Sequence, residues 1–277
     1  MKGYTDLHLH IIPGIDGDGP ADLESSLQMA RGLVEQGFRR VVATPHCFEG
    51  NPSVTEILER WRQLDGELKR REIPLQVLPG AELLIEPRLP ERARQGQVLP
   101  LNRGRYLLLE LPLFQEVPPY LEELLFELKA CGYAPILAHP ERVKTFQRDL
   151  SLLSRLVSGG LYTQLTISSL TGLQGSTVQR TAGRMLDRRL VHLLGTDAHS
   201  GGGRLLETGP ALKLLTKKIG AAGVEAMLKT RPEQLLHGQE LEIPTVLTEK
   251  SRWQLLKKKL FSNRRQGMSH GRGTRFT

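Results

Sequence analysis

Short apolar segments rich in β-branched residues alternate along the chain with longer segments whose apolar residues recur at helical period. This alternation is typical of β-strand–α-helix units. We expect strands at Tyr4–His10, Arg39–Thr44, Leu75–Leu78, Tyr106–Glu110, Ala134–Ala138, Leu161–Leu165 and Val191–Leu194. We expect helices at Asp22–Gln36, Thr55–Arg71, Pro119–Ala130, Asp149–Ser158 and Ser176–Asp187, with closing helices at Leu206–Ile219 and Gly223–Lys229. Helix ends are expected at Gly37, Gly132 and Gly159, because glycine readily takes the left-handed conformation of a C-terminal cap.

Polar residues that end one expected strand tend to recur after about 30 residues along the chain. A (β/α)8 barrel of about 250 residues spends roughly 31 residues per unit and carries its chemistry at the carboxyl ends of the strands. The seven expected strands fit a barrel of this kind with one unit missing. A doubly wound open sheet would give a similar alternation, so the pattern alone leaves both α/β architectures open.

Five polar clusters end expected strands, and Glu110 ends a run of leucines. The clusters are His8-Leu9-His10, Thr44-Pro45-His46, Gly80-Ala81-Glu82, His139-Pro140-Glu141-Arg142 and Asp197-Ala198-His199. Residues i and i+2 of a strand point to the same face, so His8 and His10 can bind one ion, and Asp197 and His199 can face one cavity. Imidazole and carboxylate suit Zn, Fe and Mn, and an oxygen-rich set favours the harder ions. The clusters therefore predict a metal site.

Three histidines lie outside this pattern, and we interpret them as structural or exposed: His192, His237 and His270.

Composition places the chain among ordinary globular proteins. It has 277 residues, 39% hydrophobic and 25% charged, and no apolar run long enough for a membrane-spanning helix. The N-terminal segment has no apolar core of a secretion signal, and two cysteines cannot form a disulfide framework. We therefore expect a cytoplasmic protein.

The net charge of +8 belongs to the C-terminal segment. Nine basic residues and no acid lie between Lys250 and the end, which leaves 29 basic and 30 acidic residues elsewhere. A near-neutral body argues against binding nucleic acid. We expect a domain over residues 1–245 and a basic, flexible tail over 246–277.

Seven motifs in this order resemble the PHP (polymerase and histidinol phosphatase) superfamily, and within it the CpsB/CapC-type bacterial tyrosine-protein phosphatases of capsule and exopolysaccharide gene clusters. They are DLHLHIIPGID, VVATPH, VLPGAEL, LLLELP, PILAHPERV, YTQLT and GTDAH, and the resemblance extends from Asp6 to about Leu241. The resemblance implies a distorted seven-stranded (β/α)7 TIM-like barrel that holds three divalent ions. Manganese is the expected metal, with iron or zinc as alternatives.

The resemblance also implies the ligand sets. The first ion would be bound by His8, His10, Glu82 and Asp197. The second would share Glu82 and add Glu110 and His139. The third would use His46, His199 and an aspartate of the loop Gly14–Gly19.

The sequence departs from the family pattern in that loop. The usual Gly-x-Asp-Asp-Gly is replaced by Gly14-Ile15-Asp16-Gly17-Asp18-Gly19, with one residue inserted. Asp18 keeps the local context before Gly19-Pro20, whereas Asp16 keeps the distance from His10. We assign Asp18 to the third ion and keep Asp16 as the alternative.

Arg142 and Arg204 match basic positions that would hold phosphate in the family, and a guanidinium matches phosphate oxygens with its planar fork. Clustered metals lower the pKa of a bound water from 15.7 toward about 7 and neutralise phosphoryl oxygens. We expect hydroxide formed in this way to attack phosphorus, with His199 or a bound water supplying a proton.

A cysteine-based tyrosine phosphatase would need Cys-x5-Arg. The residues six positions after Cys47 and Cys131 are Ser53 and Leu137, so this chemistry is not expected. Cys131 is interpreted as a small buried residue.

By the same resemblance, the expected substrate is a phosphotyrosine protein, namely the C-terminal tail of a bacterial tyrosine kinase that regulates capsule or exopolysaccharide synthesis. The segment Trp253–Phe261 combines apolar and basic residues and could lie on the inner face of an anionic membrane. A solvated tail is the interpretation we favour. The oligomeric state stays open.

Three other functions stay open. A histidinol-phosphate phosphatase is the nearest alternative function, because it would use the same kind of metal site. A nuclease or proofreading module fits the neutral body poorly. A non-catalytic scaffold would predict missing ligands, and only the Asp16–Asp18 loop is irregular.

Overall fold

The computed structural model describes residues 3–112 and 116–247. The tail expected over residues 246–277, with its Trp253–Phe261 segment, lies almost wholly outside the described residues. None of the helices in the described ranges is both long and apolar enough to cross a membrane.

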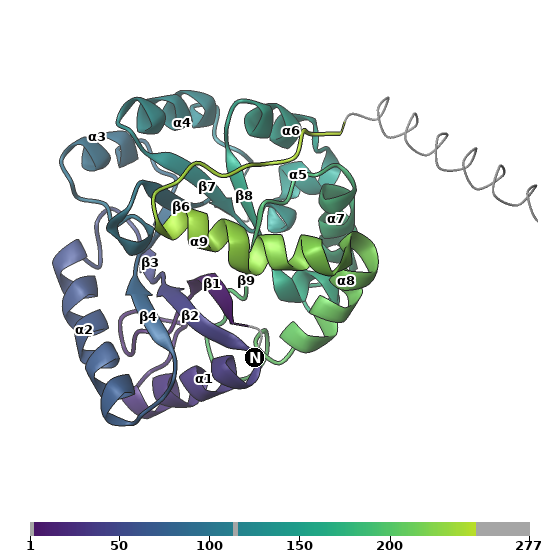
Figure 1. The fold of residues 1–277 in the computed structure, drawn as a ribbon. Helices are drawn as coiled ribbons and strands as arrows, with labels where there is room; N and C mark the ends of the chain where they lie inside the picture. Colours follow the sequence, from purple (N-terminus) through teal and green to yellow (C-terminus); the bar gives the residue numbers. More distant parts are fainter. Residues whose placement is uncertain (1–2, 113–115, 248–277) are drawn as a thin grey trace, which may run out of the picture.

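Parallel strands form the centre of the molecule, and helices surround them (Figure 1). The strands are β1 (Tyr4–Leu9), β2 (Phe38–Ala43), β3 (His46–Cys47), β4 (Gln76–Pro79), β5 (Glu82–Leu84), β6 (Tyr106–Glu110), β7 (Ala134–Ala138), β8 (Tyr162–Thr166) and β9 (Leu193–Gly195). One sheet has the order β1-β2-β4 and the other β3-β5-β6-β7-β8-β9, and all the pairs are parallel. The expected α/β class is confirmed.

The helices follow the strands along the chain. They are α1 (Leu23–Glu35), α2 (Val54–Arg70), α3 (Leu89–Arg94), α4 (Leu121–Ala130), α5 (Lys144–Arg148), α6 (Ser151–Ser158), α7 (Ser176–Asp187), α8 (Thr208–Glu225) and α9 (Arg231–Leu236). Single turns of 3₁₀ helix lie at Leu101–Arg103, Pro140–Arg142 and Ile167–Leu170, and a π-helical turn at Ala226–Thr230 joins α8 to α9.

Helix boundaries follow local capping chemistry. The Asp22 side chain accepts a hydrogen bond from the Ser25 N–H at 2.8 Å, and Ser53 accepts one from the Glu56 N–H at 3.2 Å. Gly37 and Gly132 take positive φ after α1 and α4, as expected. After α6, Gly160 takes the left-handed conformation, whereas Gly159 has φ −82°, so the predicted cap is one residue too early.

Two expected strands continue as separate short strands beyond a break. β2 ends at Ala43 and β3 begins at His46, with Pro45 between them. β4 ends at Pro79 and β5 begins at Glu82, beyond Gly80, where a Cβ would lie 2.8 Å from Val42 Cγ1. His46 pairs with Glu82 across this second register. The breaks therefore place two predicted site residues side by side.

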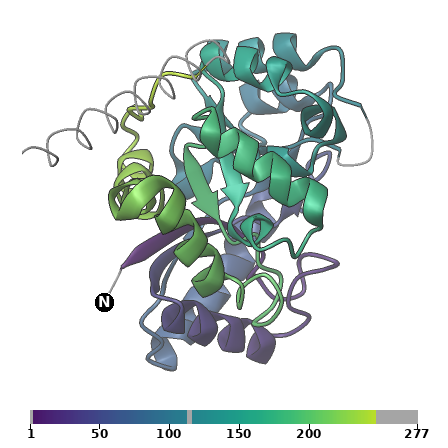
Figure 2. The same cartoon turned by 90° about the vertical axis from the view of Figure 1, so that its right-hand side faces the viewer.

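The apolar residues form two clusters on opposite faces of the strands. Tyr106 and Leu108 of β6 belong to the inner cluster, whereas Leu107 and Leu109 pack outward among the helices. Leu235 of α9 joins the inner cluster, and the Tyr106 hydroxyl donates to the Gln239 carbonyl at 2.5 Å. Figure 2 shows α9 on the side where β1 begins, so α9 covers the amino ends of the strands.

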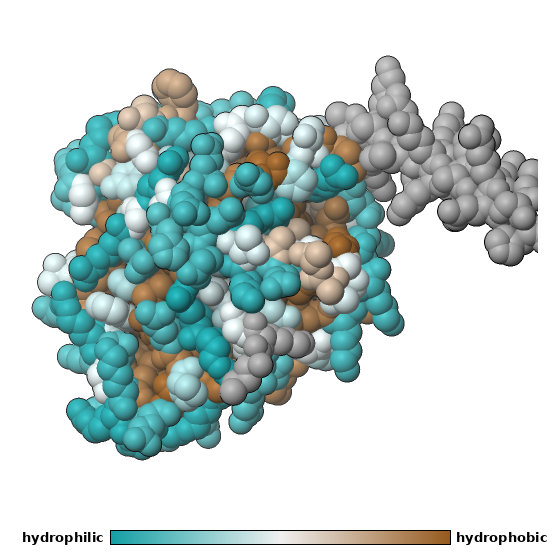
Figure 3. Space-filling view, in the orientation of Figure 1, coloured by the Kyte–Doolittle hydropathy of each residue, from teal (hydrophilic) through white to brown (hydrophobic). Residues whose placement is uncertain are grey.

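The surface seen in Figure 3 is mainly hydrophilic, and its hydrophobic residues form small, separated patches. Cys131 was expected to be buried, but it is partly exposed because it ends α4 at the surface.

Candidate metal centre

The structure brings the predicted site residues together beyond the carboxyl ends of the strands. His8 lies on β1 and His10 follows it, His46 opens β3, Glu82 opens β5, Glu110 ends β6, and His139 follows β7. Asp197 and His199 follow β9, and Asp18 lies in the loop after β1. Parallel strands whose carboxyl ends meet at one edge explain how residues from opposite ends of the domain become neighbours.

Glu82 is fully buried and lies at the centre of the cluster. Its Oε2 is 3.2 Å from His8 Nε2, 3.4 Å from His10 Nε2 and 3.1 Å from His46 Nδ1. Its Oε1 is 3.0 Å from His139 Nε2. One carboxylate thus faces four imidazoles, an arrangement that would suit the binding of divalent cations.

Neighbouring side chains fix the orientation of the first two histidines. His8 Nδ1 is 2.8 Å from Gln164 Oε1, and His10 Nδ1 is 3.0 Å from Asp16 Oδ2. Each Nε2 is thereby directed toward Glu82. Hydrogen bonds of this kind set the tautomer and ring direction of histidines that bind metals.

Asp16 and Asp18 occupy different places in their loop. Asp16 accepts from the His46 N–H at 2.9 Å as well as facing His10 Nδ1. Asp18 Oδ2 lies 3.1 Å from His199 Nε2 and 3.9 Å from His46 Nε2. Ligand atoms of His10, Asp18, His46 and His199 all lie within 4.8 Å of one another. Asp16 is thus engaged in orienting its neighbours, whereas Asp18 faces two other histidines.

Asp197 joins the cluster to both predicted arginines. Its Oδ1 is 3.6 Å from His8 Nε2, while Oδ2 is 3.1 Å from Arg142 Nη1 and 2.6 Å from Arg204 Nη1. Asp197 has φ 50°, and His139 has φ 32°, so two site residues adopt the left-handed conformation that side chains usually avoid.

The charges in the cluster oppose the effect of burial. Burial lowers the pKa of His8 and His10, but the carboxylates around them raise it to about 9 and about 10. Burial works against ionisation of Glu82, yet the His8 charge and the surrounding imidazoles hold its pKa well below the usual value. Burial and then the neighbouring Glu82 charge raise the pKa of Glu110. The fold therefore gathers carboxylate groups at a buried place, where their negative charge requires positive charge nearby.

Buried polar atoms that lack hydrogen bonds indicate whether this site fits cations. Among the described residues, His8 Nε2, His10 Nε2, His46 Nδ1 and Glu82 Oε2 are buried and lack hydrogen bonds, although they converge. Buried polar atoms are costly when unsatisfied. Nitrogen and oxygen donors arranged in this way fit divalent cations of the Mn, Fe and Zn type.

Several residues that position this cluster were not predicted from the sequence. Asp6 accepts from the His8 N–H at 3.1 Å and from the Thr196 hydroxyl at 2.5 Å. Glu141 accepts from the Ser169 hydroxyl at 2.7 Å. Gln164 was detectable, because it is an amide between Thr163 and Leu165 inside an expected strand. Asp6 carried a similar signal at the start of DLHLH.

Neither thiol belongs to the groups of converging ligand atoms among the described residues. Cys47 is buried, its Sγ lies 3.4 Å from Arg92 Nη2, and burial raises its pKa. A buried thiol of raised pKa is a poor nucleophile, in agreement with the missing Cys-x5-Arg motif.

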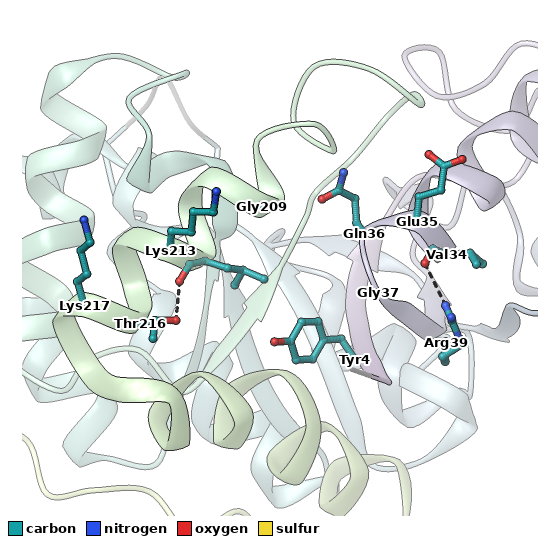
Figure 4. Close-up of a pocket in the computed structure, with 11 residues that line it drawn as sticks. Tyr4, Val34, Glu35, Gln36, Gly37, Arg39, Gly209, Lys213, Thr216 and Lys217 are labelled. Atoms are coloured by element: carbon teal, nitrogen blue, oxygen red, sulfur yellow. Dashed lines mark hydrogen bonds between the residues drawn. The ribbon is translucent and has the colours of Figure 1, made fainter. Parts of the chain in front are cut away.

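A pocket of about 800 Å³ lies away from the cluster, at the other end of the strands. Tyr4 begins β1, Gly37 and Arg39 flank the start of β2, and Lys213 and Thr216 lie on α8 (Figure 4). The pocket holds none of the predicted site residues, so its size does not identify the active site.

Comparison with known proteins agrees with this geometry. The family described as "Capsular polysaccharide synthesis, CpsB/CapC" matches residues 4–237. The tyrosine-protein phosphatase YwqE of Bacillus subtilis is 37% identical over 240 residues, which cover 85% of this chain and 92% of that protein. The tyrosine-protein phosphatase CpsB of Streptococcus pneumoniae is 26% identical, over 84% of this chain and 98% of that protein.

Solved structures agree as well. The crystal structure reported for YwqE of Bacillus subtilis and CpsB of Streptococcus pneumoniae, described as unique metal-dependent tyrosine phosphatases, superposes with a TM-score of 0.82 at 36% identity. It covers 88% of this chain and all of that chain. A phosphotriesterase homology protein from Escherichia coli, at 14% identity and a TM-score of 0.58 over 85% of this chain and 99% of that one, shares the fold alone.

Proposed function

Because the chain belongs to the CpsB/CapC family, we propose that it is a metal-dependent protein-tyrosine phosphatase acting in capsule or exopolysaccharide synthesis. The observation that carries the proposal is the position of Glu82, whose two oxygens face four imidazoles placed by three strands, β1, β3 and β7. The relatives named as tyrosine phosphatases supply the substrate class, a phosphotyrosine protein.

The proposal includes three ions, with manganese as the expected metal. Their ligands would be His8, His10, Glu82 and Asp197 for the first; Glu82, Glu110 and His139 for the second; and Asp18, His46 and His199 for the third. The short distances around Glu82 and between Asp18 and His199 support these sets. When bound, such ions supply an acidified water and positive charge beside the phosphoryl oxygens.

Arg142 and Arg204 would hold the phosphoryl oxygens. Both guanidinium groups are partly exposed and converge on Asp197 Oδ2, so they face the cluster from one side. His199 is better suited to be a ligand than a proton donor. Its Nδ1 lies 2.9 Å from the Asp197 carbonyl, and its Nε2 faces Asp18.

The finer fold and the domain limits belong to the same proposal. A bridge between Leu9 and Ala198, with the Asp197 N–H donating to the His8 carbonyl at 2.9 Å, supports a closed, distorted seven-stranded barrel. The proposed domain ends near residue 245, since Leu241 is buried and Val246 packs on the core. A bacterial tyrosine kinase tail as substrate and a cytoplasmic location, at the membrane or not, are further parts of the proposal.

A chelator experiment tests the function. The full chain should hydrolyse a phosphotyrosine peptide, lose this activity after metal is stripped, and regain it with Mn²⁺. Glu82→Gln, which keeps the shape but removes the charge, should fail to regain it. Unchanged activity in the stripped protein would refute the metal mechanism. Faster turnover of histidinol phosphate than of the peptide would favour the alternative small-molecule phosphatase.

A further inference from the structure

A groove of about 530 Å³ adjoins one side of the metal centre. Asp18, His46 and Glu110, all three proposed ligands, are among the residues that line it. Ile15, Phe48 and Pro52, which are not proposed ligands, line it as well. A phosphate ester held at the centre would therefore lie beside a partly apolar wall.

Phe48 is the prominent residue of this wall. Its relative exposure is 43%, and within the described ranges it is the large exposed hydrophobic residue that adjoins the cluster. Its ring stacks on that of His46, with centroids 5.3 Å apart and an angle of 29° between the planes. An aromatic ring that remains exposed beside a reaction centre offers a surface on which another ring can pack.

The backbone holds Phe48 firmly in this place. The Phe48 N–H donates to the Asn51 carbonyl at 3.0 Å, and the Asn51 N–H donates to the Phe48 carbonyl at 2.8 Å. This tight turn follows β3 directly, so the ring is placed by the same element that places His46. A pre-positioned ring binds a ligand without the cost of ordering a mobile loop.

We propose that Phe48, together with Ile15 and Pro52, forms the seat for the phenyl ring of phosphotyrosine and thereby selects aryl over alkyl phosphates. This inference rests on the proposed phosphatase function and names its specificity residue. The aryl ring is one ester oxygen away from phosphorus, so the ring of a bound phosphotyrosine falls beside the side chains that border the ligands. A phosphoserine has no ring to fill this seat.

The test compares two phosphonates that are not hydrolysed. Binding of phenylphosphonate and of methylphosphonate to the Mn²⁺-loaded full chain is measured by titration calorimetry. Phe48→Ala should weaken phenylphosphonate binding about tenfold, the loss expected for one aromatic contact with its buried area. Methylphosphonate binding should stay within twofold. Phe48→Tyr should restore the preference for the aryl ligand.

Phe126→Ala is the matched control, because Phe126 is also exposed but lies on α4 and does not line the groove. It should bind both phosphonates as the unchanged protein does. Metal content is measured in every variant.

Equal losses of affinity for both phosphonates, or loss of metal in Phe48→Ala, would show that Phe48 only supports His46 and would overturn the proposal. So would an unchanged affinity for phenylphosphonate. An unmodified chain that leaves phosphotyrosine peptide intact would instead refute the phosphatase function.

Discussion

Single side chains decide which oxygen faces which imidazole, and the loop with one inserted residue shows this most clearly. Asp16 and Asp18 are two positions apart, yet Asp16 contacts His10 and the backbone of His46, while Asp18 contacts the His199 ring. The first contact orients a neighbouring ligand, and the second places a carboxylate oxygen among imidazole nitrogens. Substitutions of the two aspartates should therefore affect metal binding in different ways.

Asp18→Asn should lower the number of bound ions by one, because it removes a proposed ligand charge. Asp16→Asn should keep the full number at saturating Mn²⁺ but weaken metal affinity on the order of 10–100-fold, as loss of an orienting contact does. Metal analysis after dialysis at graded Mn²⁺ concentrations distinguishes the two. If Asp16→Asn lost an ion and Asp18→Asn kept it, the two assignments would have to be exchanged.

The Gln164 side chain of β8 reaches past β9 to His8 of β1, and Gly195 of β9 makes room for it. A Cβ at Gly195 would lie 2.5 Å from Gln164 Nε2 and 2.9 Å from His8 Cβ. Gln164 Oε1 in turn lies 2.8 Å from His8 Nδ1. Three neighbouring elements thus hold one imidazole, and the absence of a side chain at Gly195 is part of that support.

Gly195→Ala should cost about 1–3 kcal/mol of unfolding free energy, the usual penalty for overpacking. It should also weaken metal affinity about tenfold, because Gln164 is displaced from His8. Gly183→Ala in α7 is the control, since nothing lies within 4 Å of its Cβ. Alanine there should be neutral or stabilise by up to about 1 kcal/mol. Urea unfolding measures the change in stability, and Mn²⁺ titration measures the change in metal affinity. Equal stability and equal affinity in the two variants would disprove the close packing at Gly195.

The stability of the whole molecule depends on groups far from the metal centre as well. His192 precedes β9 and is buried, its Nδ1 accepts from the Thr163 N–H at 3.0 Å, and Arg231 donates to its carbonyl at 2.9 Å. Burial, and then the Arg231 charge, lower the His192 pKa from 6.5 to about 3. His192 is therefore neutral in the folded protein and ties the strands to the segment that begins α9.

This shift predicts a pH dependence of global stability. Above pH 6.5 neither state binds a proton at His192, so its contribution is complete. Between pH 6.5 and about 3 the unfolded chain binds a proton and the folded one does not, so stability falls as pH falls. The slope approaches about 1.4 kcal/mol per pH unit.

His192→Gln, which keeps a hydrogen-bond acceptor, should lack this contribution, so the difference in unfolding free energy between the unchanged protein and the variant should follow this slope. Urea unfolding of metal-free protein between pH 4.5 and 7.5 measures it. His237→Gln is the control, because His237 is exposed on the end of α9. Parallel pH profiles of the unchanged protein and His192→Gln would contradict the prediction.

Most of the long elements could be predicted from the sequence. The strands Tyr106–Glu110 and Ala134–Ala138 and the helix Ser176–Asp187 have the expected bounds. The short elements could not, since β3, β5, α3 and α5 span between two and six residues and are too short to show a period. Two closing helices were expected at Leu206–Ile219 and Gly223–Lys229, and α8 is interrupted between them at Gly220, where φ is 78°.

By itself, the sequence determined the order of strand and helix units and the chemistry of their ends, because periodicity and residue type are local properties. Histidines and acids at strand ends are sufficient to predict a metal site once parallel strands are assumed. Only the tertiary structure decided which atoms meet: that Glu82 faces four imidazoles, that Asp16 and Asp18 point to different partners, and that Phe48 stands exposed beside His46. These outcomes depend on contacts between segments distant in the chain, where packing and hydrogen bonds of several elements together set the direction of each side chain.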